Sequence, residues 1–179
     1  MRGPLAGVAG SLLTIVGSLL IYVARPMAKP IVVQPEIHSA EYQRALFDAS
    51  KVYGKAGCGD QSLAEMTARH AVDTGVPAVL IAAQIATESN CNPFVVSNRG
   101  AVGLMQVTTK PWAKEFDFTK INLFNPEDNM TVGCSITSRL VKQYGVREGL
   151  IRYYGTGPDA IGLGGAGYAA KILQLTGRL

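Results

Sequence analysis

The stretch that decides the fold is VPAVLIAAQIATESNCNPFVVSNRGAVGLMQV, residues 76–107. Its first half is apolar on almost every side, which predicts a helix buried at the centre of the domain. Pro77 stands near the first helical position, where a proline is tolerated. The helix is expected to end just after Glu88, before a proline turn and a glycine loop. The sequence therefore places a carboxylate at the end of its most buried helix.

Glu88 is unfavourable at this position for two reasons. The C-terminal end of a helix carries partial negative charge, which opposes a carboxylate, and an apolar helix removes water from it. Both effects raise its pKa, and a carboxyl group that stays protonated near neutral pH can act as a general acid. The alternative, from spacing alone, is a Glu88 side chain that points into solvent from a frayed helix end.

Helical patterns fill the rest of the domain, and clear alternating strands are missing. Asp60 and Asn125 are predicted N-caps, and Gly75 and Gly145 are predicted helix ends. The pattern leaves room for one short strand at residues 102–107. We therefore predict an all-α or α-dominated domain, with helices at residues 39–57, 60–75, 76–89, 108–116, 125–145, 146–155 and 167–177.

The N-terminal part differs in composition from this domain. Residues 5–24 carry no charge, and a helix of that length spans roughly 30 Å, the thickness of a bilayer core. We interpret this segment as a transmembrane anchor, with a cleaved signal segment as the alternative. Residues 25–37 contain three prolines and are expected to form an extended tether. The remaining residues, 38–179, then form the soluble domain.

Composition limits the classes of function. The chain has 179 residues, 47% hydrophobic and 17% charged, which suits one globular domain with a substantial core. Its net charge of +4 is too small for a typical nucleic-acid binder, and it fits an anionic partner such as a cell-wall polymer or a lipid surface. The sequence contains no phosphate loop, dinucleotide fingerprint or metal-ligand spacing, so no cofactor is implied.

Two groups of residues resemble a known family. The first is a Glu-Ser pair, an Asn-Pro turn, a serine nine residues after the glutamate, and Gly-Leu-Met-Gln. The second is a helix that begins with Asn-Pro-x-x-Asn and carries a glycine one turn on. Over residues 58–175 the chain resembles the lytic transglycosylases of the soluble type, which cleave peptidoglycan with a goose-lysozyme-like domain. The matching residues are Glu88, Ser89, Asn92, Pro93, Ser97, Gly103, Leu104, Met105, Gln106, Asn125, Pro126, Asn129 and Gly133.

The resemblance implies a lysozyme-like fold and a mechanism with one carboxylate. Glu88 would protonate the β-1,4 glycosidic oxygen between N-acetylmuramic acid and N-acetylglucosamine. It would then deprotonate the C6 hydroxyl of the same muramoyl sugar, which closes a 1,6-anhydro ring without water. Most glycosidases need a second carboxylate. Asp117, Asp128 and Asp159 are the candidates here, and capping or solvation accounts for all three.

The loop after Glu88 offers groups that can bind a sugar. Gly103 lets the backbone turn sharply and approach a sugar ring. Met105 offers a polarizable face that can pack on the ring. Ser97 and Gln106 can hydrogen-bond sugar hydroxyls and the N-acetyl group.

One departure from the family concerns its Tyr-Asn pair, in which the tyrosine helps position the acid or the N-acetyl group. The corresponding stretch here is RYYGTGPDA, with two tyrosines and no asparagine. We expect Tyr153 to be the family tyrosine, with Tyr154 in the place of the asparagine. The loss of the asparagine leaves the acid in place.

The three cysteines leave one without a partner if a disulfide forms. Cys58 precedes a predicted helix, and Cys91 lies in the turn after Glu88, so a bond between them would brace that turn. We predict a Cys58–Cys91 disulfide, with Cys134 as a small core residue. Three free thiols are the alternative.

Two other functions stay open at this point. A lysozyme-like hydrolase of the same fold would add water and leave reducing ends instead of anhydro ends. A non-catalytic wall-binding or assembly component of a secretion apparatus or phage virion would keep the fold without the reaction. In each case the expected partners are glycan strands of peptidoglycan and, through residues 5–24, a membrane; assembly partners stay unidentified. The domain is expected in the periplasm or on the outer side of the cytoplasmic membrane, or else secreted or in a virion membrane.

Overall fold

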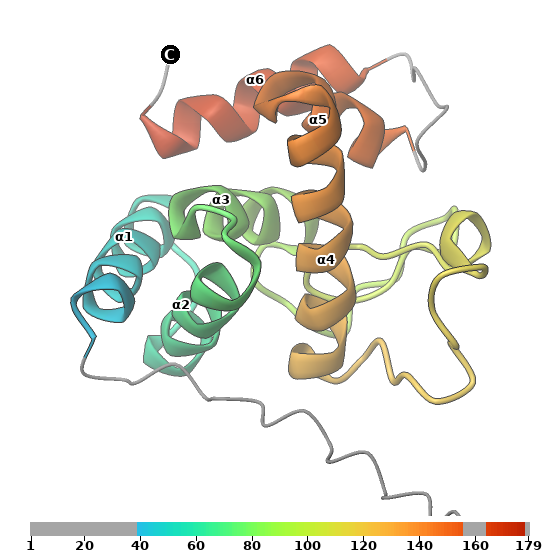
Figure 1. Ribbon diagram of the computed structural model, residues 1–179, viewed down its shortest axis with the longest axis horizontal. Helices are drawn as coiled ribbons and strands as arrows, with labels where there is room; N and C mark the ends of the chain where they lie inside the picture. Colours follow the sequence, from blue (N-terminus) through green and yellow to red (C-terminus); the bar gives the residue numbers. More distant parts are fainter. Residues whose placement is uncertain (1–38, 156–163, 178–179) are drawn as a thin grey trace, which may run out of the picture. The chain divides into compact units, whose positions relative to one another are not determined.

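The computed structural model describes residues 39–155 and 164–177. Within these ranges the chain forms six α-helices, one 3₁₀-helix and no strand, which confirms the predicted helix-dominated domain (Figure 1). The elements are α1 (Ala40–Ala56), α2 (Gln61–Thr74), α3 (Ala78–Ser89), η1 (Lys110–Trp112), α4 (Pro126–Tyr144), α5 (Val146–Tyr154) and α6 (Gly165–Thr176).

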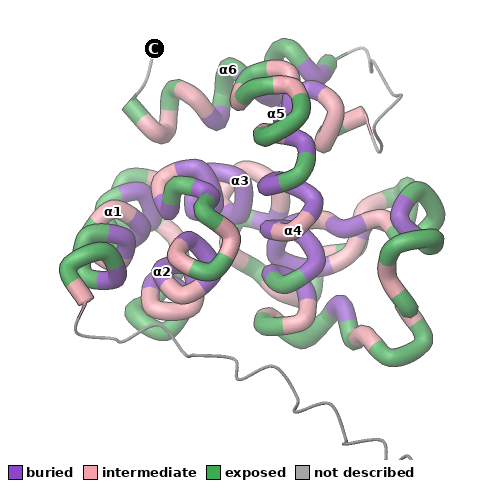
Figure 2. Tube along the Cα trace, viewed as in Figure 1, coloured by how far each residue is buried: buried purple, intermediate pink, exposed green. Residues whose placement is uncertain are grey.

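The helix α3 is the most buried element, and it packs against α1, α2 and α6 (Figure 2). Because almost every side of this helix is apolar, neighbouring helices can cover it from several directions. Ile81 and Ile85 are fully buried. The helix ends at Ser89, so Glu88 lies in its last turn, as the sequence predicts.

The first two helices begin at side-chain caps, and α2 begins and ends at the predicted residues Asp60 and Gly75. The Ser39 hydroxyl accepts a hydrogen bond from the Tyr42 amide (3.1 Å), and the Asp60 carboxylate accepts one from the Leu63 amide (2.8 Å). Each bond satisfies an amide that has no partner within the helix. Gly75 ends α2 in the left-handed conformation, with φ of 70°.

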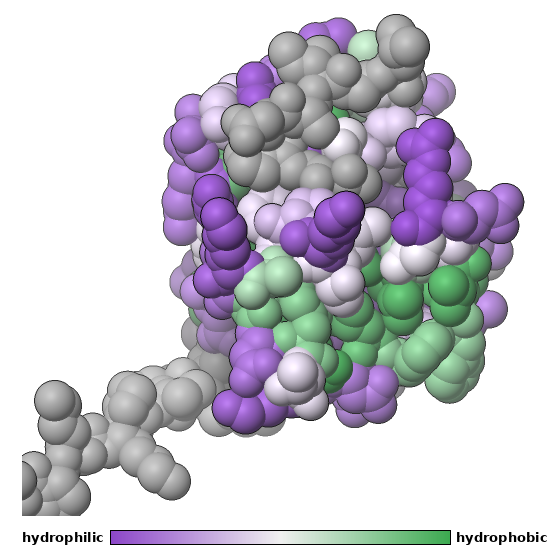
Figure 3. Space-filling view, turned by 90° about the vertical axis from the view of Figure 1, so that its right-hand side faces the viewer, coloured by the Kyte–Doolittle hydropathy of each residue, from purple (hydrophilic) through white to green (hydrophobic). Residues whose placement is uncertain are grey.

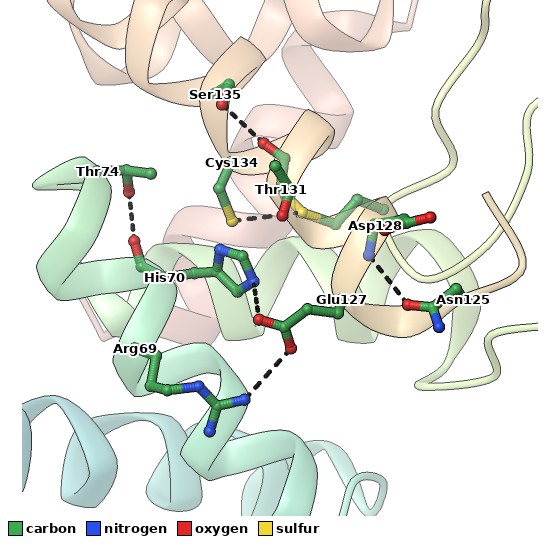
Figure 4. A network of polar contacts seen from close by, with 10 residues as sticks. Arg69, His70, Thr74, Asn125, Glu127, Asp128, Thr131, Cys134 and Ser135 are labelled. Carbon is green, nitrogen blue, oxygen red and sulfur yellow. Dashed lines mark hydrogen bonds and ion pairs between the residues drawn. The ribbon is translucent and has the colours of Figure 1, made fainter. Parts of the chain in front are cut away.

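The start of α4 is fixed against α2 by a polar network (Figure 4). The Asn125 side chain caps α4 by accepting a hydrogen bond from the Asp128 amide (3.1 Å). Glu127, in the first turn, lies 3.2 Å from the Arg69 guanidinium and 3.3 Å from His70 Nε2. A carboxylate is also favourable at this end of a helix. These contacts fix where α4 begins.

Residues 90–125 connect α3 to α4 with only the short helix η1 as regular structure. The possible strand at residues 102–107 is reduced to two isolated bridges, Val96–Val102 and Val102–Val107. The turns in this segment interrupt any longer pairing, since Gly103 and Gln106 both have positive φ. The segment is therefore a folded loop.

A buried asparagine of α4 holds this loop in place. Asn129 Oδ1 accepts a hydrogen bond from the Met105 amide (2.8 Å). Its Nδ2 donates to the carbonyl oxygens of Val102 (2.8 Å) and Leu123 (2.9 Å). One fully buried side chain thus satisfies three backbone groups of the loop.

Hydrophobic side chains also reach the surface in the connecting segment. Phe94, Val96 and Phe124 are among the large hydrophobic residues that stay exposed. Figure 3 looks onto the side of the molecule where much of this segment lies, and it shows hydrophobic residues gathered on part of that face. The loop therefore has an apolar outer surface as well as a buried one.

The expected membrane or signal segment (5–24) and the expected tether (25–37) lie outside the described residues. Of the helices within residues 39–155 and 164–177, none combines the length and the apolar composition needed to span a bilayer.

Candidate active site

A cleft with a volume of about 390 Å³ opens beside the end of α3. The part of its lining that comes from the α-helices, here called the helical wall, consists of Glu88 of α3, Ile136 of α4, and Tyr153 and Tyr154 of α5. The part that comes from the segment between α3 and α4, here called the loop wall, includes Ser97, Arg99, Gln106 and Trp112. The cleft thus brings together Glu88 and four of the predicted sugar-binding residues.

The Glu88 carboxyl is half-buried and bonded to the last helix. The Tyr168 hydroxyl of α6 donates a hydrogen bond of 2.6 Å to Glu88 Oε1. Burial raises the pKa of Glu88 to about 7, although the Tyr168 hydrogen bond and the charge of Lys171 act in the opposite direction. Near neutral pH the carboxyl therefore exists in both protonation states, as an acid that also serves as a base requires.

The turn after α3 is held in an uncommon conformation. Asn90 and Cys91 have φ angles of 50° and 62°, in the left-handed region that residues with a side chain seldom adopt. A disulfide joins Cys91 to Cys58, with Cα atoms 5.7 Å apart. Cys134 is a free, buried cysteine. The disulfide therefore ties the turn that follows Glu88 to the segment between α1 and α2.

The two tyrosines of α5 have different environments. The Tyr153 hydroxyl donates a hydrogen bond of 2.7 Å to the Met105 carbonyl oxygen, and burial and the charge of Glu88 raise the pKa of Tyr153. Tyr154 is 43% exposed, and its ring centre lies 5.0 Å from that of Tyr168. Tyr153 therefore links the loop to the helical wall, and Tyr154 presents an aromatic surface at the cleft.

Tyr168 is the partner of Glu88 that the sequence did not identify. It lies 80 residues after Glu88 in the chain, and no motif marks it. The only signal was its place in the amphipathic pattern of the last helix, where it is 7% exposed. Periodicity predicts that such a residue is buried but does not identify its partner.

The loop wall is shaped by hydrogen bonds to the backbone. Gln106 Nε2 donates to the carbonyl oxygens of Val95 and Gly103, both at 3.0 Å. Ser97 Oγ accepts hydrogen bonds from the amides of Arg99 (3.3 Å) and Ala101 (3.0 Å). Both predicted residues therefore reach the cleft while they also fix the turn that carries them.

Two predicted sugar contacts are wrong. The Met105 side chain is fully buried, where it packs on Gly133 and lies 3.7 Å from the Cys134 sulfur. Gly103 is also buried, and a Cβ atom there would overlap the Asn129 side chain. The loop turns these two residues toward α4, so they anchor the loop and do not face the cleft.

The candidates for a second carboxylate lie elsewhere. Asp117 is exposed and accepts hydrogen bonds from Thr119, and Asp128 accepts one from the Asn122 amide (2.9 Å). Asp159 lies outside the described residues. Among the described residues that line the cleft, Glu88 is the only carboxylate.

The comparison with protein families agrees with this geometry. Residues 65–166 match the family model of the transglycosylase SLT domain. The match covers more than half of the chain, and the chain therefore belongs to this family. Membership confirms the lytic transglycosylase family with its lysozyme-like fold, and it supports a lytic-transglycosylase-type activity on peptidoglycan in general. No curated protein matches the chain.

Proposed function

We propose that the protein is a peptidoglycan lytic transglycosylase in which Glu88 is the single general acid and base. The substrate bond is the β-1,4 linkage between N-acetylmuramic acid and N-acetylglucosamine, and the product carries a 1,6-anhydro ring. The observation that carries the proposal is the half-buried Glu88 carboxyl in the cleft, with a pKa of about 7.

In the first step, the protonated Glu88 gives its proton to the glycosidic oxygen as the bond from that oxygen to C1 breaks. The N-acetyl group of the muramoyl sugar stabilises the positive charge that develops at C1. The Tyr168 hydroxyl, which donates to Oε1, stabilises the carboxylate that forms. The leaving sugar keeps the proton as its new hydroxyl.

In the second step, the Glu88 carboxylate takes the proton of the C6 hydroxyl while that oxygen forms a bond to C1. The ring closes, Glu88 is protonated again, and no water enters the reaction. One group that changes its protonation state twice needs a pKa near the working pH, which burial of Glu88 supplies.

The composition of the cleft favours this reaction over hydrolysis. Most glycosidases use a second carboxylate that activates water or acts as a nucleophile. The described lining of the cleft offers only Glu88 in this role. Ser97, Gln106 and Tyr154 are proposed to bind the sugars on either side of the bond, since all three line the same cleft.

We also propose that the domain works outside the cytoplasm. The Cys58–Cys91 disulfide is typical of proteins in an oxidising compartment. Residues 5–24 would hold the domain at the outer surface of the cytoplasmic membrane, and residues 25–37 would let it reach the wall. Cell fractionation followed by protease treatment of intact spheroplasts tests this: the chain should sediment with membranes and be cleaved from outside.

The reaction is tested by the mass of its products. The full chain and Glu88→Gln are incubated with purified peptidoglycan, and the released fragments are analysed by mass spectrometry. Fragments lighter than hydrolysis products by one water, about 18 Da, are expected from the wild type and not from the variant. Reducing-end products would overturn the transglycosylase assignment, and full activity of Glu88→Gln would overturn the role of Glu88.

A further inference from the structure

The buried helix α3 carries one polar side chain that its apolar pattern does not explain. Gln84 is fully buried, and it lies four residues before Glu88, on the same face of the helix. Burial of an amide without hydrogen bonds is costly, by about 1–3 kcal/mol. A buried glutamine at this position is therefore expected to form specific hydrogen bonds.

The contacts of Gln84 lead toward Glu88. On one side, Thr137 of α4, which is 1% exposed, donates a hydrogen bond of 3.1 Å to Gln84 Oε1. On the other side, the Gln84 amide acts on the Tyr168 hydroxyl and lowers its pKa against larger effects that raise it. Tyr168 in turn donates to Glu88 at 2.6 Å. The three helices around the acid thus contribute one residue each to a buried polar row.

The hydroxyl of Thr137, the amide of Gln84 and the hydroxyl of Tyr168 can each donate a hydrogen bond in the direction of Glu88. Because Gln84 Oε1 accepts from Thr137, the free end of the amide is the donor Nε2, which is buried and has no partner of good geometry among the described residues. Because Tyr168 gives its proton to Glu88, its oxygen can accept one. A hydrogen bond from Gln84 Nε2 to the Tyr168 oxygen would satisfy this buried donor, which is costly to leave unpaired.

We infer that Gln84 is a positioning residue, held by Thr137, that fixes Tyr168 as a hydrogen-bond donor to Glu88. This inference rests on the proposed function, and it assigns a role to residues that do not line the cleft. Donors aligned in a row strengthen one another and stabilise a negative charge at the end of the row. Gln84 and Thr137 therefore stabilise the carboxylate that exists between the two steps of the reaction.

The charged and titratable groups near Glu88 come from two helices and the loop. Tyr168 and Lys171 of α6 and Tyr153 of α5 face it, and Arg99 of the loop wall lines the same cleft. Substitution of Gln84 or Thr137 leaves Lys171, Tyr153 and Arg99 in place, and within this set it acts only on the Tyr168 hydroxyl. A change in the titration of Glu88 can therefore be assigned to the polar row.

The test is a titration of Glu88 by NMR in the full chain, labelled with ¹³C at glutamate carboxyl groups and assigned with Glu88→Gln. Gln84→Met keeps the size of the side chain and removes the amide, and Thr137→Val removes the donor to it. Each should raise the pKa of Glu88 by about half a unit, which corresponds to a weak hydrogen bond. On peptidoglycan, each should lower kcat about fivefold and leave KM unchanged, since neither residue touches the cleft.

Thr67→Val is the matched control. Thr67 is a fully buried helix threonine in α2, and its hydroxyl shares a hydrogen bond of 2.7 Å with Tyr53. This variant should lose similar stability and leave both the titration of Glu88 and kcat unchanged. A purely structural role for Thr137 would make the two valine variants alike.

The double variant keeps the test decisive if a single variant folds poorly. Gln84→Met with Thr137→Val replaces both partners by apolar groups, which is often nearly neutral for stability. Its pKa shift should be smaller than the sum of the single shifts, because both act through Tyr168. An unchanged titration of Glu88 in the folded double variant would overturn the inference. Failure of the wild type to release anhydro products would overturn the proposed function instead. In that case the titration would still show whether Gln84 and Thr137 affect the pKa of Glu88.

Discussion

The two walls of the cleft are built by different means. On the helical wall, Glu88 is set by burial and by one short hydrogen bond from Tyr168. On the loop wall, Ser97 and Gln106 direct their polar groups to the backbone, and Gln106 has a φ of 48°. The comparison suggests a division of roles. Substitutions on the helical wall should alter the reaction rate and its dependence on pH. Substitutions of the residues that anchor the loop should alter the free energy of unfolding.

The largest effect is expected for Glu88→Gln, which keeps the shape of the helical wall and removes its acid. The rate on peptidoglycan should fall about a thousandfold, within the range for loss of a general acid. Glu41→Gln, at an exposed position in α1, is the control and should keep full activity.

The same substitution should stabilise the protein at high pH. The pKa of Glu88 in the folded state, about 7, lies above its ordinary value. The wild type therefore loses stability as the pH rises from about 4.5 through 7, because the buried carboxyl must ionise. At pH 8, Glu88→Gln should be more stable in urea unfolding, on the order of 2 kcal/mol after allowance for partial exposure. Equal stability of the two proteins at pH 8 would contradict the burial of Glu88.

Removal of the disulfide tests whether the two walls depend on the turn between them. The bond closes a loop of 33 residues, so Cys58→Ala with Cys91→Ala should cost about 3–4 kcal/mol in the free energy of unfolding. Because Asn90 and Cys91 are then free to leave the left-handed region, activity should fall too. Urea unfolding of the oxidised and reduced wild type gives the same comparison without substitution. Identical midpoints for the two forms would contradict this account.

Two glycines of the loop have the same backbone conformation but different surroundings, so substituting each by alanine separates the two effects. Gly103 and Gly100 both have a φ of 78°, but a Cβ atom at Gly103 would overlap Asn129 and the Leu123 carbonyl, and one at Gly100 meets nothing within 4 Å. Gly103→Ala should therefore destabilise the fold by about 3 kcal/mol and Gly100→Ala by about 1 kcal/mol. Thermal unfolding checks the difference, and equal shifts would mean that the loop is not fixed through Asn129.

A smaller effect than for Glu88→Gln is expected for Tyr168→Phe, which removes one hydrogen bond from the helical wall. The pKa of Glu88 should rise by about one unit, since this bond favours the carboxylate. The rate near neutral pH should fall about tenfold, because the carboxylate formed in the first step loses a donor. Tyr53→Phe removes a buried hydroxyl that does not line the cleft, and it serves as the control. A similar loss of rate in both variants would contradict the assignment.

The sequence predicts the helices well because their ends are marked locally. Asp60, Asn125 and Gly75 lie where capping rules place them, and the position of Glu88 follows from the length of an apolar run. The loop was harder to predict, because its residue types suit both sugar contact and anchoring. Met105 shows this, since its polarizable side chain packs on Gly133 and not in the cleft.

Contacts between distant helices could not be predicted from one sequence. Tyr168 meets Glu88 across 80 residues, and Thr137 meets Gln84 across 53. Helical periodicity marks each of these residues as inward-facing, but the pairing depends on how α3, α4 and α6 pack. One sequence therefore does not reveal these pairings, although it does place Glu88 at the end of α3.

The most direct test of the central claim is the dependence of kcat/KM on pH for the full chain acting on soluble glycan fragments. Free enzyme must carry a protonated Glu88 to begin the reaction, so the account predicts a plateau at low pH. Above a single ionisation at about 7, kcat/KM should fall tenfold per pH unit. A fall that begins near pH 4.5, the ordinary range of an exposed glutamate, would contradict the claim that a half-buried Glu88 is the acid.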